Sequence, residues 1–131
     1  MYPMGLHLDG RRVLVVGGGN VAHRRVPRLV DEGADVFLVA PRVHTSLRGM
    51  AEAGHVRWEA REFHPGDVAG AWLVLAAADD PAVNAEVSAL AEAAHTFCVR
   101  ADDASAATAW TPAVTENDGL TVAAFADVDP R

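Results

Sequence analysis

Short apolar runs alternate with amphipathic segments along the first hundred residues of the chain. Arg12 to Val16 is a β-branched apolar run that ends in three glycines, and the apolar positions that follow recur at helical spacing up to Gly33. A second apolar run, Asp35 to Ala40, ends at Pro41. Continuous apolar runs of this length are typical of strands buried on both faces of a parallel sheet. The pattern therefore predicts a strand, a glycine turn, a helix and a second strand.

The alternation continues to Arg100 and then changes. The Asp80-Pro81 pair is a helix N-cap followed by a residue suited to the first helical turn, so an alanine-rich helix is expected up to about Ala94. Beyond Arg100, two short strands are expected around Asp118-Gly119, a strong hairpin dipeptide. The remaining predicted elements are a short helix over Thr45 to Ala53 and strands over Val56 to Phe63, Ala71 to Ala77 and Thr96 to Arg100.

Alternating strands and helices predict an α/β fold with a doubly wound, mainly parallel sheet, followed by a short β-hairpin extension. We expect one main domain over residues 1–114, with the extension over residues 115–131. In a sheet of this kind the ligand crevice lies at the carboxyl ends of the strands. Residues that directly follow the strands are therefore the first candidates for a site.

Composition excludes several classes of function. The chain has 131 residues and a net charge of −7, which opposes general binding of nucleic acid. Every basic side chain is an arginine, so neither a Schiff-base lysine nor a Walker A loop is available. No apolar run approaches the length of a membrane span, and the six histidines show no metal-ligand spacing. The single cysteine, Cys98, reads as a small buried hydrophobe in a cytoplasmic protein.

The sharpest local motif is Gly17-Gly18-Gly19-Asn20-Val21-Ala22, which matches G-x-G-x-x-A between a predicted strand and a predicted helix. The glycines would allow a tight turn and a close approach of the backbone to a pyrophosphate, and the helix start offers unpaired amides. The alternative is a tight turn without a ligand. The βαβ context favours dinucleotide binding.

The acidic residue that commonly binds the adenosine ribose at the end of the second strand is absent. Pro41 and Arg42 stand there instead, and an arginine also suits a 2′-phosphate. The choice between NAD and NADP therefore stays open at this point, as does the alternative that Arg42 is a solvated loop residue. Farther along, the backbone of Ala77 and Ala78 follows the fourth strand and could line a bound nucleotide.

Two aspartate pairs lie at the crevice end of the predicted sheet. Asp79 and Asp80 precede a helix, so capping is the favoured interpretation. Asp102 and Asp103 follow the fifth strand in a loop where no helix is expected, which makes them candidates for a general base or for an Asx turn. Three tryptophans are candidate core residues, the last of them alternatively facing a flat ligand: Trp58, Trp72 and Trp110.

Three ordered segments together resemble a known family: GRRVLVVGGGNVAHRRV, WLVLAAADDPAVNAEV and TFCVRADDASAATAWTPAV. They resemble the N-terminal domain of siroheme synthase, the precorrin-2 dehydrogenase and sirohydrochlorin ferrochelatase family, over Leu6 to about Ala124. The resemblance implies a Rossmann-like fold, NAD as cofactor, and oxidation of the tetrapyrrole precorrin-2 to sirohydrochlorin in siroheme biosynthesis. It also implies a homodimer and, in many members, insertion of Fe²⁺ as a second reaction.

Site residues follow from the same resemblance. The family's NAD contacts fall on Asn20, Val21, Pro41 and Arg42. Its aspartate base falls on Asp102 within an FCxxxD match. Substrate carboxylates call for nearby arginines, for which the candidates are Arg24, Arg25 and Arg100.

The chain also departs from the family. Ala78 stands where a threonine is common, and the segment from Phe125 to Asp129 lacks the usual Ser/Thr- and Gly-rich turn. Residues 115–131 would then include only the start of a truncated dimerisation region, and the parent protein would be a larger one fused to a methyltransferase. The alternatives of another class are a non-catalytic NAD(H)-sensing regulatory domain and an inactive scaffold.

Overall fold

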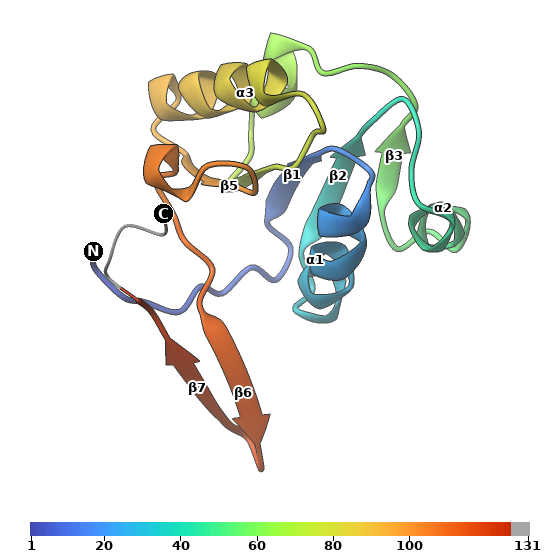
Figure 1. Cartoon of the computed structure of the whole chain (residues 1–131). Helices are drawn as coiled ribbons and strands as arrows, with labels where there is room; N and C mark the ends of the chain where they lie inside the picture. Colours follow the sequence, from blue (N-terminus) through green and yellow to red (C-terminus); the bar gives the residue numbers. More distant parts are fainter. Residues whose placement is uncertain (127–131) are drawn as a thin grey trace.

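A five-stranded parallel sheet forms the centre of the computed structural model, which describes residues 1–126 (Figure 1). The strand order is β3-β2-β1-β4-β5, so the chain starts in the middle of the sheet and winds first to one edge and then to the other. The strands are β1 (Arg12–Val16), β2 (Asp35–Val39), β3 (Arg57–Glu59), β4 (Leu73–Ala76) and β5 (Phe97–Arg100). This is the predicted doubly wound α/β fold.

Helices cover both faces of the sheet. One face carries α1 (Asn20–Asp31) and α2 (Thr45–Glu52), and the other carries α3 (Pro81–Ala93) with the short 3₁₀ helix η1 (Pro65–Val68) (Figure 1). The two faces are built from alternate residues of the same strands. In β1, Val13 and Val15 pack toward α1 and α2, whereas Leu14 and Val16 pack toward α3 and η1.

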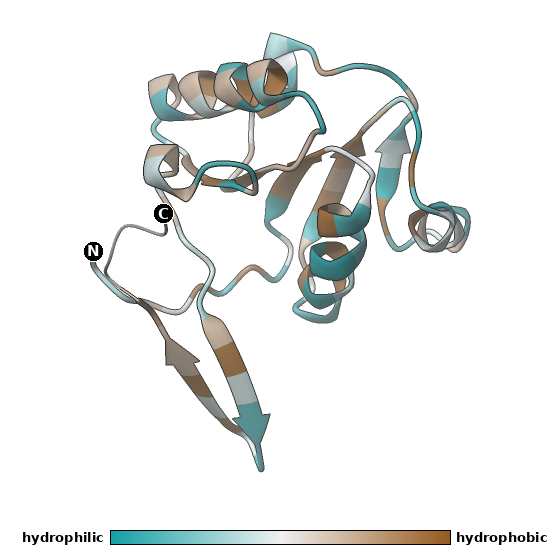
Figure 2. Cartoon of the chain, viewed as in Figure 1, coloured by the Kyte–Doolittle hydropathy of each residue, from teal (hydrophilic) through white to brown (hydrophobic). Residues whose placement is uncertain are grey.

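Burial on both faces explains why the central strands read as continuous apolar runs. Val13, Leu14 and Val15 are completely buried, and Cys98 of β5 is buried as predicted. In Figure 2 the central strands β1 and β2 are coloured mainly brown, which marks hydrophobic residues. Among the described residues, none of the helices is both long enough and apolar enough to cross a membrane.

An antiparallel hairpin projects away from the sheet (Figure 1). It pairs β6 (Ala113–Asn117) with β7 (Leu120–Ala124), and Asp118 and Gly119 at its turn both have positive φ, 50° and 80°. Positive φ at both central residues defines the hairpin turn that the Asp-Gly pair predicts. The hairpin begins two residues before the expected boundary at 114/115, and that domain boundary stays a prediction. The last part of the expected dimerisation region, residues 127–131, lies outside the described residues.

Two sequence predictions about this fold are wrong. The third strand ends at Glu59 rather than Phe63, because its last register partner in β2 is Val39 and the proline two residues later has no N–H to continue the ladder. Trp72 is not a core residue. Its side chain is 62% exposed and lies under the Arg11 guanidinium, 4.7 Å from the ring centroid.

Candidate functional site

A cleft of about 670 Å³ opens at the carboxyl ends of β1, β2 and β4. This is where the sequence places the crevice of a doubly wound sheet. It collects most of the predicted cofactor-binding positions from three separate parts of the chain. Those that line it are Gly17, Gly18, Gly19, Pro41, Arg42, Ala77 and Ala78.

The turn after β1 requires glycine for two different reasons. Gly17 has φ of +119°, which L side chains rarely adopt, and a Cβ there would overlap the carbonyl of Ala77. At Gly18, a Cβ would overlap the carbonyl of Arg42 and the side chain of Val43. The turn is thereby packed against the ends of both β4 and β2.

The amino end of α1 is open toward an anion. Gly19 is the N-cap residue, it provides no side-chain cap, and the first turn of the helix holds no acidic residue. Ala22 is fully buried, which allows the close contact between the helix and the sheet that the motif requires. A helix start of this kind binds a phosphate group through its free amides. Asn20 and Val21 belong to this first turn, although Val21 also lines a second cavity described below.

The segment after β2 is fixed in place beside the glycine turn. The His44 amide donates a 2.7 Å hydrogen bond to the Gly18 carbonyl, and Trp58 Nε1 donates one of 2.9 Å to the Ala40 carbonyl. Trp58 is half-buried against the core, as expected of it. Between these anchors, Pro41 and Arg42 form the wall of the cleft.

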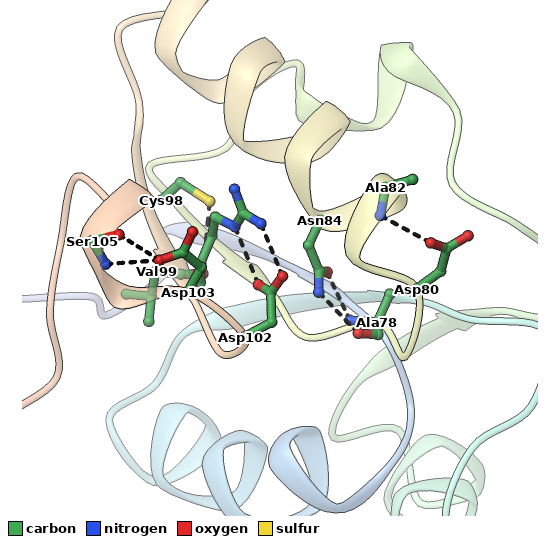
Figure 3. Close-up of polar contacts among 10 residues, drawn as sticks. Ala78, Asp80, Ala82, Asn84, Cys98, Val99, Asp102, Asp103 and Ser105 are labelled. Carbon is green, nitrogen blue, oxygen red and sulfur yellow. Dashed lines mark hydrogen bonds and ion pairs between the residues drawn. The ribbon is translucent and has the colours of Figure 1, made fainter. Parts of the chain in front are cut away.

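On the opposite wall, a buried side-chain amide holds the backbone after β4. The Oδ1 atom of Asn84 accepts a hydrogen bond from the Ala78 amide, and its Nδ2 atom donates to the Ala78 carbonyl, both at 2.9 Å. Asn84 is completely buried. Sequence analysis missed this residue, although an asparagine at a buried position inside an alanine-rich helix is a usable signal, because it must find polar partners. The dashed lines in Figure 3 mark both contacts.

Asp79 and Asp80 border the same cleft. Asp80 is the N-cap of α3, and its Oδ1 atom accepts a 2.9 Å hydrogen bond from the Ala82 amide. The capping interpretation is confirmed for Asp80.

Asp102 lies just beyond the end of β5, held by Arg100 (Figure 3). The guanidinium donates from Nε to Oδ1 at 3.1 Å and from Nη2 to Oδ2 at 2.8 Å. This contact lowers the pKa of Asp102 below its ordinary value, and Asn84 adds a further, smaller lowering. The carboxylate is therefore ionised, and its two polar neighbours come from different elements, Arg100 from β5 and Asn84 from α3.

The expectation that no helix follows Asp103 is wrong. A short 3₁₀ helix, η2 (Ala104–Ala106), begins there, and Asp103 Oδ1 accepts hydrogen bonds from the amide and the hydroxyl of Ser105. Asp103 thus caps η2, whereas Asp102 forms an ion pair with Arg100.

A second cavity of about 500 Å³ lies between α1, the end of β5 and the start of the hairpin. Its lining is mostly apolar but includes Arg25 and Arg100. Burial, followed by the nearby charge of Arg24, lowers the pKa of Arg25. Trp110 also lines this cavity and donates from Nε1 to the Ala104 carbonyl at 2.8 Å. A role for its ring against a flat ligand stays a prediction.

Within residues 1–126, no three side chains of His, Cys, Asp or Glu come together in a way that could hold a metal ion. The rings of His23 and His44 are stacked, with their centroids 3.9 Å apart.

A parallel sheet with a glycine turn after its first strand, a helix start open to an anion and a cleft at the switch point defines a dinucleotide-binding domain of the Rossmann type. Comparison with known proteins agrees. Residues 4–113 match the family described as "Putative NAD(P)-binding". The chain belongs to this family, together with precorrin-2 dehydrogenase and siroheme synthase.

Three individual proteins illustrate how similar the chain is to members of this family. Precorrin-2 dehydrogenase of Bacillus subtilis is 34% identical over 126 residues, covering 93% of this chain and 75% of that protein. Siroheme synthase 3 of Aeromonas hydrophila is 39% identical over 121 residues, covering 92% of this chain. The solved structure of SirC, a precorrin-2 dehydrogenase, superposes with a TM-score of 0.84 at 30% identity over 97% of this chain.

The chain is shorter than these relatives. It spans 26% of the Aeromonas siroheme synthase and 62% of the SirC chain.

Proposed function

We propose that the chain is the catalytic dinucleotide-binding part of an NAD-dependent precorrin-2 dehydrogenase that oxidises precorrin-2 to sirohydrochlorin. One observation carries the proposal. Arg100, which pairs with Asp102, lines the second cavity, and Asn84, whose side chain also contacts Asp102, holds Ala78 on the wall of the first. A carboxylate linked through these two residues to both cavities is a candidate base for a substrate in the second cavity that passes a hydride to a cofactor in the first.

The residues of the first cavity fit a dinucleotide. The glycine turn and the start of α1 would hold the pyrophosphate through Gly17, Gly18, Gly19, Asn20 and Val21. Pro41 and Arg42 would contact the adenosine half, and Ala77 and Ala78 the other half. When bound, NAD⁺ supplies the two-electron acceptor of the reaction.

The second cavity fits a flat, acidic macrocycle. Its walls are mostly apolar, Trp110 offers an aromatic ring, and Arg25 and Arg100 offer positive charge to substrate carboxylates. Because the chain as a whole carries a net charge of −7, such local arginines are needed to attract a polycarboxylate.

Asp102 is the proposed general base, which removes a proton from the macrocycle during oxidation. In the present arrangement the Arg100 contact lowers its pKa and makes it a weak base. A substrate carboxylate that takes over the Arg100 guanidinium would release Asp102 and raise its pKa. Arg100 would thus make Asp102 available as a base only when the substrate is bound.

The test is anaerobic production of NADH from NAD⁺ and precorrin-2, followed by absorbance. Asp102→Asn should lower the rate about a hundredfold to ten-thousandfold, which is the usual contribution of a general base, while NAD⁺ binding is retained. Asp103→Asn is the matched control, because Asp103 caps η2 and should leave the rate within about threefold. Wild-type protein that binds NAD⁺ but forms no NADH would instead favour an NAD(H)-sensing domain.

Two further assignments belong to the same proposal. The exposed apolar side chains of the hairpin, Val114, Leu120 and Val122, support a homodimer, since an isolated two-stranded hairpin is marginally stable in water. Light scattering of the purified protein tests this. Insertion of Fe²⁺ as a substrate would use Asp102 for the pyrrole protons, and this ferrochelatase activity stays a prediction, as does a cytoplasmic location.

A further inference from the structure

The wall of the dinucleotide cleft beside β2 carries one unpaired positive charge. Arg42 is exposed and lines the cleft, and its guanidinium makes no hydrogen bond or ion pair with any residue from 1 to 126. No other arginine of the described chain lines that cleft. An arginine fork without a protein partner is available to an anionic group of the ligand.

The carboxylate that would oppose such an anion is missing from this wall. In NAD-selective folds an aspartate or glutamate after the second strand binds the ribose hydroxyls and repels a 2′-phosphate. From Ala40 to Ser46 this chain has no acidic residue.

Four acidic residues line the cleft elsewhere. Asp79, Asp80 and Glu86 follow β4, which β1 separates from β2 in the sheet. Glu62 follows β3, the direct neighbour of β2, and is exposed. It is therefore the one acidic side chain that competes for the same end of the ligand.

The Arg42 backbone is held at the phosphate-binding turn rather than in a free loop. Gly18 approaches the Arg42 carbonyl so closely that no Cβ fits between them. The neighbouring His44 amide donates to the Gly18 carbonyl, and the His44 ring stacks on that of His23. This arrangement fixes where the side chain of Arg42 starts relative to a bound pyrophosphate, which reduces the entropy cost of binding.

We propose that the adenosine end of this cleft has a 2′-phosphate subsite with Arg42 as its anchor, so that the chain binds NADP⁺ as well as NAD⁺. This inference rests on the proposed function only in taking the cleft as the dinucleotide site. The inference adds NADP⁺ as a second cofactor and Arg42 as the residue that binds its 2′-phosphate.

The test is isothermal titration calorimetry of the purified chain, which measures binding without turnover. NADP⁺ should bind within about threefold of NAD⁺ or more tightly, and 2′,5′-ADP about tenfold more tightly than 5′-AMP, which differs only by the 2′-phosphate. Arg42→Gln should weaken NADP⁺ and 2′,5′-ADP by about tenfold to a hundredfold, the cost of losing a hydrogen bond between charged groups. NAD⁺, which lacks the 2′-phosphate, should weaken by a clearly smaller factor, so that the ratio of the two affinities shifts toward NAD⁺ by about tenfold.

Arg48→Gln is the matched control, because Arg48 is also an exposed arginine near the start of α2 but lies over the Trp58 ring and does not line the cleft. It should leave all four affinities unchanged, and melting curves check that both variants are folded. Arg42→Lys should restore part of the preference for 2′,5′-ADP.

Three results would overturn the inference. NADP⁺ binding more than about tenfold weaker than NAD⁺ would show that Glu62 or the loop excludes the phosphate. An equal loss of both dinucleotides in Arg42→Gln would make Arg42 a general contact rather than the anchor of a phosphate. Wild-type protein that binds neither dinucleotide would remove the proposed function itself, and is thereby distinguished from the first two results.

Discussion

Arg100 and Asp102, separated by a single residue at the end of β5, face each other through two parallel hydrogen bonds of 3.1 and 2.8 Å. The arginine side chain is 11% exposed and the aspartate side chain 24%. Paired in this way, the two charges hold each other in the ionised form, which raises the pKa of Arg100 and lowers that of Asp102. In the proposed mechanism, a substrate carboxylate that took over Arg100 would free Asp102 to act as the base.

Arg100→Gln tests this control directly. Loss of the guanidinium should raise the pKa of the Asp102 carboxyl toward the ordinary aspartate value of about 3.9, because the contact with Arg100 is the main cause of the lowering. Carboxyl ¹³C chemical shifts followed by NMR as a function of pH measure the change. Arg25→Gln is the control, since Arg25 lines the same cavity but makes no ion pair with Asp102. An unchanged titration in Arg100→Gln would contradict the proposed coupling.

Asn84→Ala should destabilise the protein strongly. The variant leaves both backbone groups of half-buried Ala78 without their partner and a cavity where the Asn84 side chain was, and an unsatisfied buried group costs about 1–3 kcal/mol. We expect the free energy of unfolding in urea to fall by about 2–4 kcal/mol. Asn117→Ala on the exposed hairpin should cost about 0.5 kcal/mol or less. Equal effects of the two changes would show that the amide contact contributes nothing.

The same change of glycine to alanine should have opposite signs at two positions. Gly18→Ala places a methyl group on the Arg42 carbonyl, so the turn must move and stability should fall by at least about 1–3 kcal/mol. Gly49→Ala lies inside α2 with nothing within 4 Å of the added Cβ, and it should stabilise by about 0.5–1 kcal/mol. Thermal unfolding of both variants measures the two changes in stability. A stable Gly18→Ala protein would mean that the two chain segments are not in close contact.

Asp67 should make stability depend on pH in the acid range. It is a buried carboxylate bound by Arg61 at 2.8 and 2.9 Å and by the His64 amide, and the Arg61 contact is the main reason why its pKa is lowered. Because the folded-state pKa lies below the unfolded value of about 3.9, this contribution is complete above that value and is lost as the pH falls through the folded pKa.

Asp67→Asn should therefore be less stable than wild type at pH 7, and the difference should shrink below about pH 4. Urea unfolding at several pH values measures it. Glu86→Gln, an exposed change in the middle of α3, should show no such difference at any pH. A difference that stays constant down to pH 2 would exclude the Asp67 pair as its source.

Local chemistry explains the elements that sequence analysis predicted well. The Asp80-Pro81 start of α3 and the Asp118-Gly119 turn of the hairpin are encoded within a few residues, and each is found where it was expected. The buried parallel strands follow from their apolar runs in the same way.

The third strand shows where that approach fails. Its sequence alternates as far as Phe63, but a strand can extend only as far as its neighbour can pair with it, and β2 ends before Pro41. Likewise Trp72 has the composition of a core residue but lies at the amino end of β4, where Arg11 covers it and water reaches it.

The sequence by itself determined the glycine turn, the order of strands and helices along the chain, and the candidate base Asp102. Only the tertiary structure decided that Asn84 of α3 fixes the backbone of Ala78, that Asp103 is a cap, and that Arg42 lies against Gly18 on the wall of the cleft. The reason is physical. Propensity and periodicity act over a few residues, whereas these contacts depend on which strands become neighbours and in which register, and that is settled by packing of the whole core.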